Sequence, residues 1–131
     1  MIENLNGIHE TVKYKENSNV KLFINAETED YPIHWHTPME IIMPLEGSYT
    51  VQIGDNMVQL NKSDIIFIAS GVKHRLIAPD TGKRLILQIE WSAVSKIKEL
   101  NSILTLIAPA ITLTPETSGD IHSNIRKLLL D

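Results

Sequence analysis

The chain has 131 residues, of which 43% are hydrophobic and 21% are charged, and it contains no cysteine. This length indicates one globular domain with its own core, and the lack of cysteine excludes disulfides and thiolate metal sites. The formal net charge of −4 argues against direct contact with DNA phosphates. The sequence has neither a signal peptide nor an apolar run long enough to span a bilayer. These features predict a cytoplasmic protein without a membrane partner.

The first ninety residues are predicted to form short strands. Residues 1–19 are polar and are expected to form an N-terminal arm. From Met39 to Leu45 nearly every side chain is apolar, which is typical of a strand covered on both faces. Gly54-Asp55-Asn56 tolerates positive φ and predicts a hairpin. Further strands are expected at 20–24, 48–53, 57–60, 65–68, 74–77 and 84–91. Short strands at regular spacing indicate a β-sandwich or barrel.

After Trp91 the spacing of apolar residues becomes helical. A first helix is predicted from Ser92, a good N-cap residue, to Ala108, where Pro109 ends it. We expect an extended piece at 110–114 and a loop at 115–119. A second helix is expected from Asp120, with one apolar face formed by Ile121, Ile125 and Leu128.

The C-terminal end has no helix-terminating residue. Leu128, Leu129 and Leu130 close the second helix without the Gly, Asn or Pro that usually follows a helix. We therefore expect the chain to be a fragment. Residues 92–131 are interpreted as the start of a truncated dimerisation module.

Metal-ligating side chains recur in one short stretch. His34, His36 and Glu40 lie at even offsets, so on one extended strand they would point to the same face. A later segment adds His74. Three imidazoles and a carboxylate suit a borderline divalent ion such as Zn, Ni, Fe or Mn. The alternative is a hydrogen-bonded polar cluster in which Glu40 accepts from His36 or His74 around a water.

Other polar and aromatic residues are weighed singly. Gln88 on the last strand is a further ligand-binding candidate because amides give directional hydrogen bonds to hydroxylated ligands. The alternative is that Gln88 belongs to the solvated face of an edge strand. Trp35 has the opposite parity to its flanking histidines, so it is expected to cover the outside of the strand or an interface and not to line the pocket. The lone histidines His9 and His122 are expected at the surface.

Two motifs carry a family resemblance. The run His34-x-His36-x-x-x-Glu40, closed by Gly47, resembles the first motif of the cupin superfamily. The stretch from Ser63 to His74 resembles the second, although the family usually has Gly at 63, Pro at 69 and Asn at 78. The resemblance implies a mostly β fold, a cupin-like double-stranded β-barrel (jelly roll), over residues 1–91 with the N-terminal arm. The α-helices of residues 92–131 follow it.

A barrel followed by helices also resembles the N-terminal ligand-binding and dimerisation domain of AraC-type transcription regulators. This resemblance implies a homodimer that senses a small-molecule effector, a sugar or related metabolite. It would control DNA binding through a C-terminal helix-turn-helix module absent from this chain. On this hypothesis the protein is not an enzyme. The predicted effector-binding residues are His34, His36, Glu40, His74 and Gln88, and the first four are the predicted metal ligands.

Two further hypotheses remain. A metal-dependent cupin enzyme, such as a dioxygenase or isomerase, would use the same four ligands and the open positions of the ion. A storage or scaffold barrel would leave the centre without a function, and buried polar groups argue against it because they are costly unless they are satisfied.

Overall fold

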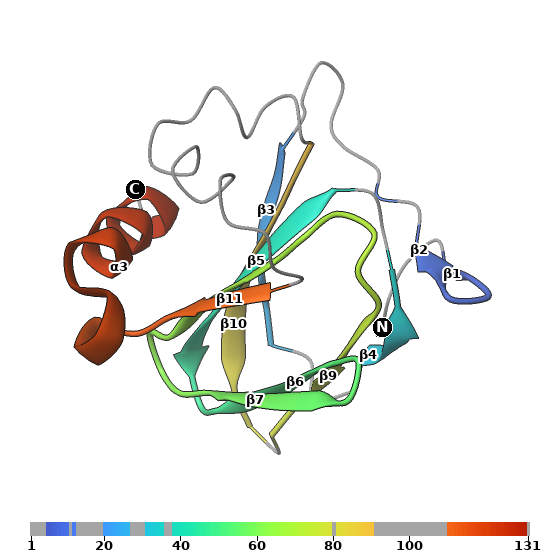
Figure 1. Ribbon diagram of the computed structural model, residues 1–131, viewed down its shortest axis with the longest axis horizontal. Coiled ribbons are helices and arrows are strands. Elements are labelled where there is room, and N and C mark those ends of the chain that lie inside the picture. The colour runs from blue at the N-terminus through green and yellow to red at the C-terminus, as the bar shows by residue number, and fades with distance from the viewer. Residues whose placement is uncertain are drawn as a thin grey trace.

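The computed structural model describes residues 5–10, 12, 20–26, 31–35, 38–79, 81–90 and 110–130, and the statements below concern these residues. Its elements are β1 (Leu5–Asn6), β2 (His9–Glu10), β3 (Val20–Asn25), β4 (Tyr31–His34), β5 (Met39–Glu46), β6 (Tyr49–Ile53), β7 (Asn56–Leu60), β8 (Ile65–Ile68), β9 (His74–Ile77), β10 (Lys83–Ile89), β11 (Ala110–Leu113) and α3 (Pro115–Leu130). Two sheets face each other (Figure 1). The predicted mostly β, jelly-roll fold is confirmed.

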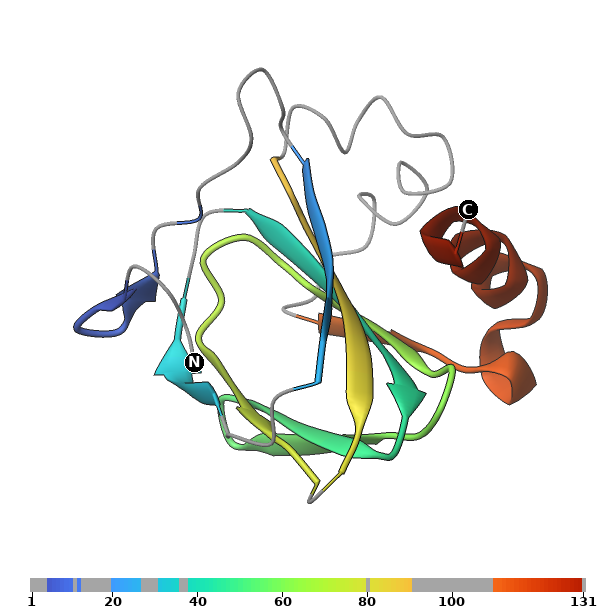
Figure 2. The same cartoon turned by 180° about the vertical axis from the view of Figure 1, so that it is seen from behind.

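The two sheets differ in size and remain separate. One has five strands in the order β11-β8-β5-β10-β3, and the other has four in the order β4-β9-β6-β7. All neighbouring strands in them are antiparallel. The barrel is therefore a sandwich of two sheets, with its interior between them (Figures 1 and 2).

The five-stranded sheet is covered on both faces, as the apolar run from Met39 to Leu45 predicts. Because side chains alternate along a strand, Met39, Ile41 and Met43 of β5 point to the outer face, whereas Glu40 and Ile42 point inward. The outer side chains pack with residues of β8, β10, β11 and α3. The inner ones face an apolar core shared with the four-stranded sheet.

Helix α3 packs on the outer face through Ile125 and Leu129, which are 0% and 4% exposed. It begins earlier than predicted, because Pro115 is well suited to a first helical position and starts a turn where a loop was expected. Gly119, with φ 48° and ψ −117°, kinks the helix after that turn. In the described parts of the chain, no helix is long and apolar enough to cross a membrane.

The surface position expected for His122 is wrong. This α3 residue is 4% exposed, and its Nε2 donates to the carbonyl oxygen of Ser63 over 2.6 Å. The bond ties the helix to the turn between β7 and β8. A single histidine gives no sequence signal for such a bond, because its partner is a backbone carbonyl distant in the sequence.

The structure describes three of the other predicted elements, at least in part. The hairpin at Gly54 is confirmed, with φ 59° at that glycine and Ile53 paired with Asn56. The extended piece before α3 is confirmed as β11, which adds to the edge of the large sheet beside β8. Part of the N-terminal arm forms the hairpin β1–β2, which lies beside β4 (Figure 2). The first predicted helix lies outside the described residues.

Candidate metal centre

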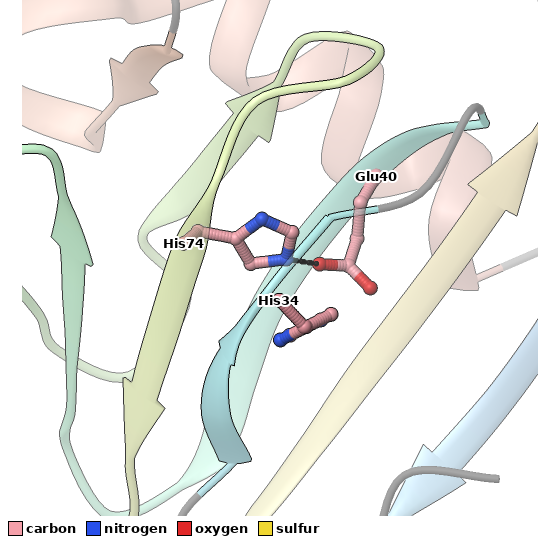
Figure 3. A group of neighbouring side chains, drawn as sticks. All are labelled: His34, Glu40 and His74. Carbon is pink, nitrogen blue, oxygen red and sulfur yellow. Dashed lines mark hydrogen bonds and ion pairs between the residues drawn. The ribbon is translucent and has the colours of Figure 1, made fainter. Parts of the chain in front are cut away.

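Two cross-strand pairs bring four polar side chains together. In the four-stranded sheet His34, the last residue of β4, lies opposite His74, the first residue of β9. In the five-stranded sheet Glu40 lies opposite Gln88. All four side chains are buried, with exposed fractions between 1% and 4%. The pairs meet between the sheets, where Nε2 of His74 lies 3.0 Å from Oε2 of Glu40 (Figure 3).

Backbone carbonyls orient both histidines. Nδ1 of His34 lies 2.8 Å from the carbonyl oxygen of Pro32, and Nδ1 of His74 lies 2.8 Å from that of Val72. A carbonyl oxygen only accepts, so each Nδ1 carries the proton and donates it. In the neutral imidazole the lone pair is then on Nε2. Both rings therefore present a nitrogen able to bind a metal, and each ring is aimed by a residue two positions earlier in the chain.

The Glu40 carboxylate uses both oxygens inside the site. Oε1 accepts a hydrogen bond from Nε2 of Gln88 at 3.1 Å, and Oε2 faces the Nε2 of His74. Two lone pairs at 3.0 Å repel each other, so this contact requires either a proton or a metal cation. The arrangement suits a divalent ion, and it is equally that of the predicted polar cluster when His74 is protonated.

Gln88 has the orientation expected of a ligand-binding residue. It lies on β10, the second strand from the edge of the large sheet, and is 3% exposed. The alternative of a solvated edge-strand face is therefore wrong. Its Oε1 is buried and has no hydrogen-bond partner among the described residues. This oxygen can accept from a ligand hydroxyl or amine, because buried acceptors are usually paired.

A second carboxylate, which the sequence did not reveal, lies beside one of these histidines. Glu10 is the last residue of β2 and is 8% exposed. Its Oε1 lies 3.6 Å from Nε2 of His34. One glutamate in a polar N-terminal arm carries no motif, so only the docking of the hairpin on the barrel makes it visible.

The assumption that one strand carries the first ligands is wrong. His34 ends β4 in the small sheet, whereas Glu40 lies in β5 of the large sheet. The chain passes from one sheet to the other between them, so these side chains face each other across the interior. His36 lies outside the described residues. Trp35 stacks on the His9 ring with centroids 4.1 Å apart, and His9 is only partly exposed.

A family comparison agrees with the fold and the motifs. The profile of the cupin domain matches residues 22–89, just over half of the chain. This chain belongs to the cupin family. The matched cupin segment runs from β3 to the end of β10 and includes Glu40, His74 and Gln88.

The proteins similar to this chain include a transcriptional regulator and an oxalate decarboxylase. YdeC, an HTH-type transcriptional regulator of Bacillus subtilis (strain 168), is 33% identical over 55 residues, 41% of this chain and 19% of YdeC. ToxT K231A from Vibrio cholerae superposes with a TM-score of 0.61 at 8% identity, over 89% of this chain and 49% of ToxT. Bacillus subtilis oxalate decarboxylase, studied for its Mn(II) centres, superposes with a TM-score of 0.51 at 20% identity. The match covers 58% of this chain and 22% of the decarboxylase.

The two structural matches show only that the fold is shared, because their sequence identities are 8% and 20%. This chain spans less than half the length of each of these proteins.

The cupin residues present here fit a divalent ion. One ligand atom from each of His34, Glu40 and His74 lies within 4.8 Å of the other two. Ligand atoms about 2.1 Å from one ion are about 3.0 Å apart at a right angle and about 3.4 Å apart at a tetrahedral angle. The distance of 3.0 Å between His74 Nε2 and Glu40 Oε2 is of this size. Imidazole and carboxylate are also the donors that borderline metals accept.

Proposed function

We propose that this cupin barrel is the effector-sensing domain of an AraC-type transcription regulator. His34, Glu40 and His74, together with His36, would hold one divalent ion, Zn, Ni, Fe or Mn. The observation that carries the proposal is the convergence of two Nε2 lone pairs on a buried carboxylate. When bound, the ion supplies a Lewis acid that anchors oxygen atoms of the effector.

The effector is a small hydroxylated molecule, a sugar or related metabolite. The free Oε1 of Gln88 supports this choice because it accepts from a hydroxyl group. A hollow of about 160 Å³ is lined by Ile33, Gln52, Gly54, Lys73 and His74, so one of the proposed metal ligands reaches it. The amide of Gln52 and the ammonium of Lys73 can bind polar groups of a ligand there.

Regulation passes to DNA through a helix-turn-helix module outside this chain. The likeness to part of YdeC supports this proposal, and the acidic net charge of −4 suits a domain that does not itself touch phosphates. Effector binding shifts the population of conformations in which two such modules are presented. This function places the protein in the cytoplasm.

A homodimer is part of the proposal. An apolar groove of about 420 Å³ runs between β3 and the end of α3, lined by Leu22, Phe23, Ile24, Leu45, Leu85, Leu129 and Leu130. Leu22 and Ile24 are 52% and 63% exposed, and Leu130 is 47% exposed. Contiguous exposed apolar side chains of this kind mark interaction surfaces. Sedimentation should give a dimer that Ile24→Glu disrupts.

The decisive experiment measures metal and effector together. Purified protein should carry about one divalent ion per chain, and a thermal-shift screen of sugars should give a hit only with that ion present. The longer protein, with its helix-turn-helix module, should bind operator DNA differently with that sugar. Wild-type protein that binds no Zn²⁺, Ni²⁺, Fe²⁺ or Mn²⁺ after reconstitution would contradict the metal site.

A metal-dependent cupin enzyme is the alternative function. The observation that favours it is the second buried carboxylate, Glu10, because oxygen or proton-transfer chemistry beside an ion needs a base. Turnover of a small hydroxylated or carboxylated compound by the metal-loaded protein, lost in Glu10→Gln, would support the enzyme. Saturable binding of the same compound without turnover would support the sensor.

A further inference from the structure

Three strands of the large sheet place a row of polar side chains on its inner face. Gln88 of β10 lies opposite Glu40 of β5 on one side and opposite Lys21 of β3 on the other. Directly opposite residues share a face of the sheet, with Cβ atoms about 4.5–5.5 Å apart. The row therefore runs from a proposed metal ligand, through an amide, to an ammonium group.

The Lys21 side chain lies along this inner face. Its Nζ is 5.1 Å from the centroid of the Phe23 ring, and Phe23 packs against the core between the two sheets. Lys21 is half-buried, and its strand β3 is the outermost strand of the large sheet, beside β10 (Figure 2). A long cationic side chain in such a position is anchored by apolar surface while its charged end stays accessible to a ligand.

The Gln88 amide presents an acceptor beside this cation. Its Nε2 donates to Oε1 of Glu40 over 3.1 Å, so its own Oε1 lies at the other end of the amide. This oxygen is buried and has no hydrogen-bond partner among the described residues. The ammonium of Lys21, placed over the Phe23 ring, does not donate to it. Buried acceptors are usually paired with a donor, and a hydroxyl group of a ligand supplies one.

We propose that Lys21 selects an effector that carries a carboxylate besides its hydroxyl groups, so that the ligand is a sugar acid and not a neutral sugar. This inference rests on the proposed sensing function and narrows its ligand class. A hydroxyl group of the ligand donates to Oε1 of Gln88, and the carboxylate accepts from Nζ of Lys21, one strand further out. One ammonium balances the single charge of a carboxylate, whereas a phosphate ester carries about −1.5 to −2 charges.

The exposure of the row gives the ligand a direction of approach. Gln88 and Glu40 are 3% and 4% exposed, whereas Lys21 is half-buried. The ammonium thus lies on the solvent side of the unpartnered acceptor, and a ligand that enters over β3 reaches Lys21 first. A cation at the entrance of a buried site attracts anions. Lys21 therefore discriminates by charge, and Gln88 discriminates by hydroxyl groups.

The test compares matched pairs of compounds by calorimetry on the full chain: D-glucuronate with D-glucose, D-galacturonate with D-galactose, and D-gluconate with D-glucitol. Wild type should bind one acid about 10- to 100-fold more tightly than its neutral partner, the effect expected of a hydrogen bond to a charged group. Lys21→Gln should remove this preference and leave the affinity for the neutral compound unchanged. Lys21→Arg keeps the charge and should retain part of the preference. Lys62→Gln removes an exposed lysine between β7 and β8 and should change neither affinity.

A further variant separates the two contacts. Gln88→Leu should weaken the acid and its neutral partner alike, because both use the hydroxyl contact. If Lys21→Gln also weakens both members of a pair equally, Lys21 has a structural role and the assignment is overturned. An acid preference that survives in Lys21→Gln overturns it as well.

The remaining outcomes distinguish this inference from the proposed function. If wild type binds an acid and its neutral partner equally, the role of Lys21 is overturned and the sugar-sensing function stands. Tighter binding of D-glucose 6-phosphate than of D-glucuronate would overturn the choice of a carboxylate. If wild type binds no compound of this panel, the inference and the proposed class of effector both fall.

Discussion

The two faces of the five-stranded sheet are equally buried and chemically different. On β5, Met39, Ile41 and Met43 point outward into an apolar core that α3 covers through Ile125 and Leu129. The inward-facing Glu40 and Ile42 alternate with them. The inner face is apolar in its middle. It carries the buried Arg84 towards one end and Glu40 and Gln88 at the other, opposite the two histidines of the other sheet.

This difference separates stability from function within one strand. The outer face gains free energy from burial alone, because each fully buried aliphatic side chain contributes about 1.5–3 kcal/mol. The polar end of the inner face replaces such side chains with groups that are costly to bury. A barrel that needed only stability would have an apolar end there. Changes on the inner face should therefore alter binding, and changes on the outer face should alter the free energy of unfolding.

His74→Ala should have the largest effect. Apparent metal-binding free energies of about 10–16 kcal/mol are shared among about four ligands, so one ligand accounts for about 2.5–4 kcal/mol. We expect ion affinity to fall about 100-fold or more, measured by competition with a chelating dye.

His122→Ala is the matched control for this prediction. It removes a buried imidazole from α3, on the other side of the large sheet, and breaks the bond to the Ser63 carbonyl. The protein should be less stable and should bind the ion as wild type does. Equal loss of the ion in both variants would show that binding follows general stability and not these ligands.

Ile125→Ala tests the outer face. Ile125 is 0% exposed and belongs to the outer core. Truncation should lower the free energy of unfolding by about 2–3 kcal/mol, through lost burial and the cavity left behind. Chemical denaturation measures this loss, and Ile125→Val should lose about 1 kcal/mol. The ion content of the folded variant should stay at the wild-type level, and a parallel loss of the ion would mean that the two faces are not independent.

Gln88→Leu tests a side chain that supports the proposed metal ligand Glu40 by a hydrogen bond and does not itself bind the ion. The variant removes the donor to Glu40 Oε1, and loss of such supporting bonds typically reduces ion affinity about 10-fold or more. It also removes a buried oxygen without a described partner, so the free energy of unfolding should change little. Gln59→Leu, at an exposed position on β7, should leave affinity unchanged. A Gln88→Leu protein that binds ion and effector normally would exclude Gln88 from the site.

Much of the fold was predictable from the sequence because local signals carried it. The run from Met39 to Leu45 showed a strand buried on both faces, and Gly54 showed a hairpin. Both signals depend on a few neighbouring residues. The sequence places the start of α3 too late because Gly119 indicates a loop, although a glycine with positive φ can also kink a helix between two helical segments.

The sequence predicted which residues meet in the site, but not which strands carry them. His34, Glu40 and His74 do meet, yet the argument from alternation on one strand does not apply, since the chain changes sheet after His34. Convergence across a sandwich depends on the pairing of distant strands, which one sequence does not display. Glu10 was missed for the same reason, because its position follows from the bridge between His9 and Trp35.

Ser63→Gly should have the smallest effect, and it acts on neither face. Ser63 has φ 71°, and among the residues that the structure describes it is the non-glycine residue with a positive φ. The left-handed conformation costs an L-residue about 1–2 kcal/mol, whereas glycine adopts it freely but loses about 0.4–1 kcal/mol more entropy on folding. The net gain in stability should be about 0.5–1 kcal/mol by denaturant titration. The bonds of Ser63 to Pro44 and His122 use its backbone, so they persist in the variant. Ser63→Ala keeps the strained backbone conformation and should not gain stability. An equal gain in this variant would mean that the hydroxyl group of Ser63, and not its backbone conformation, lowers the stability.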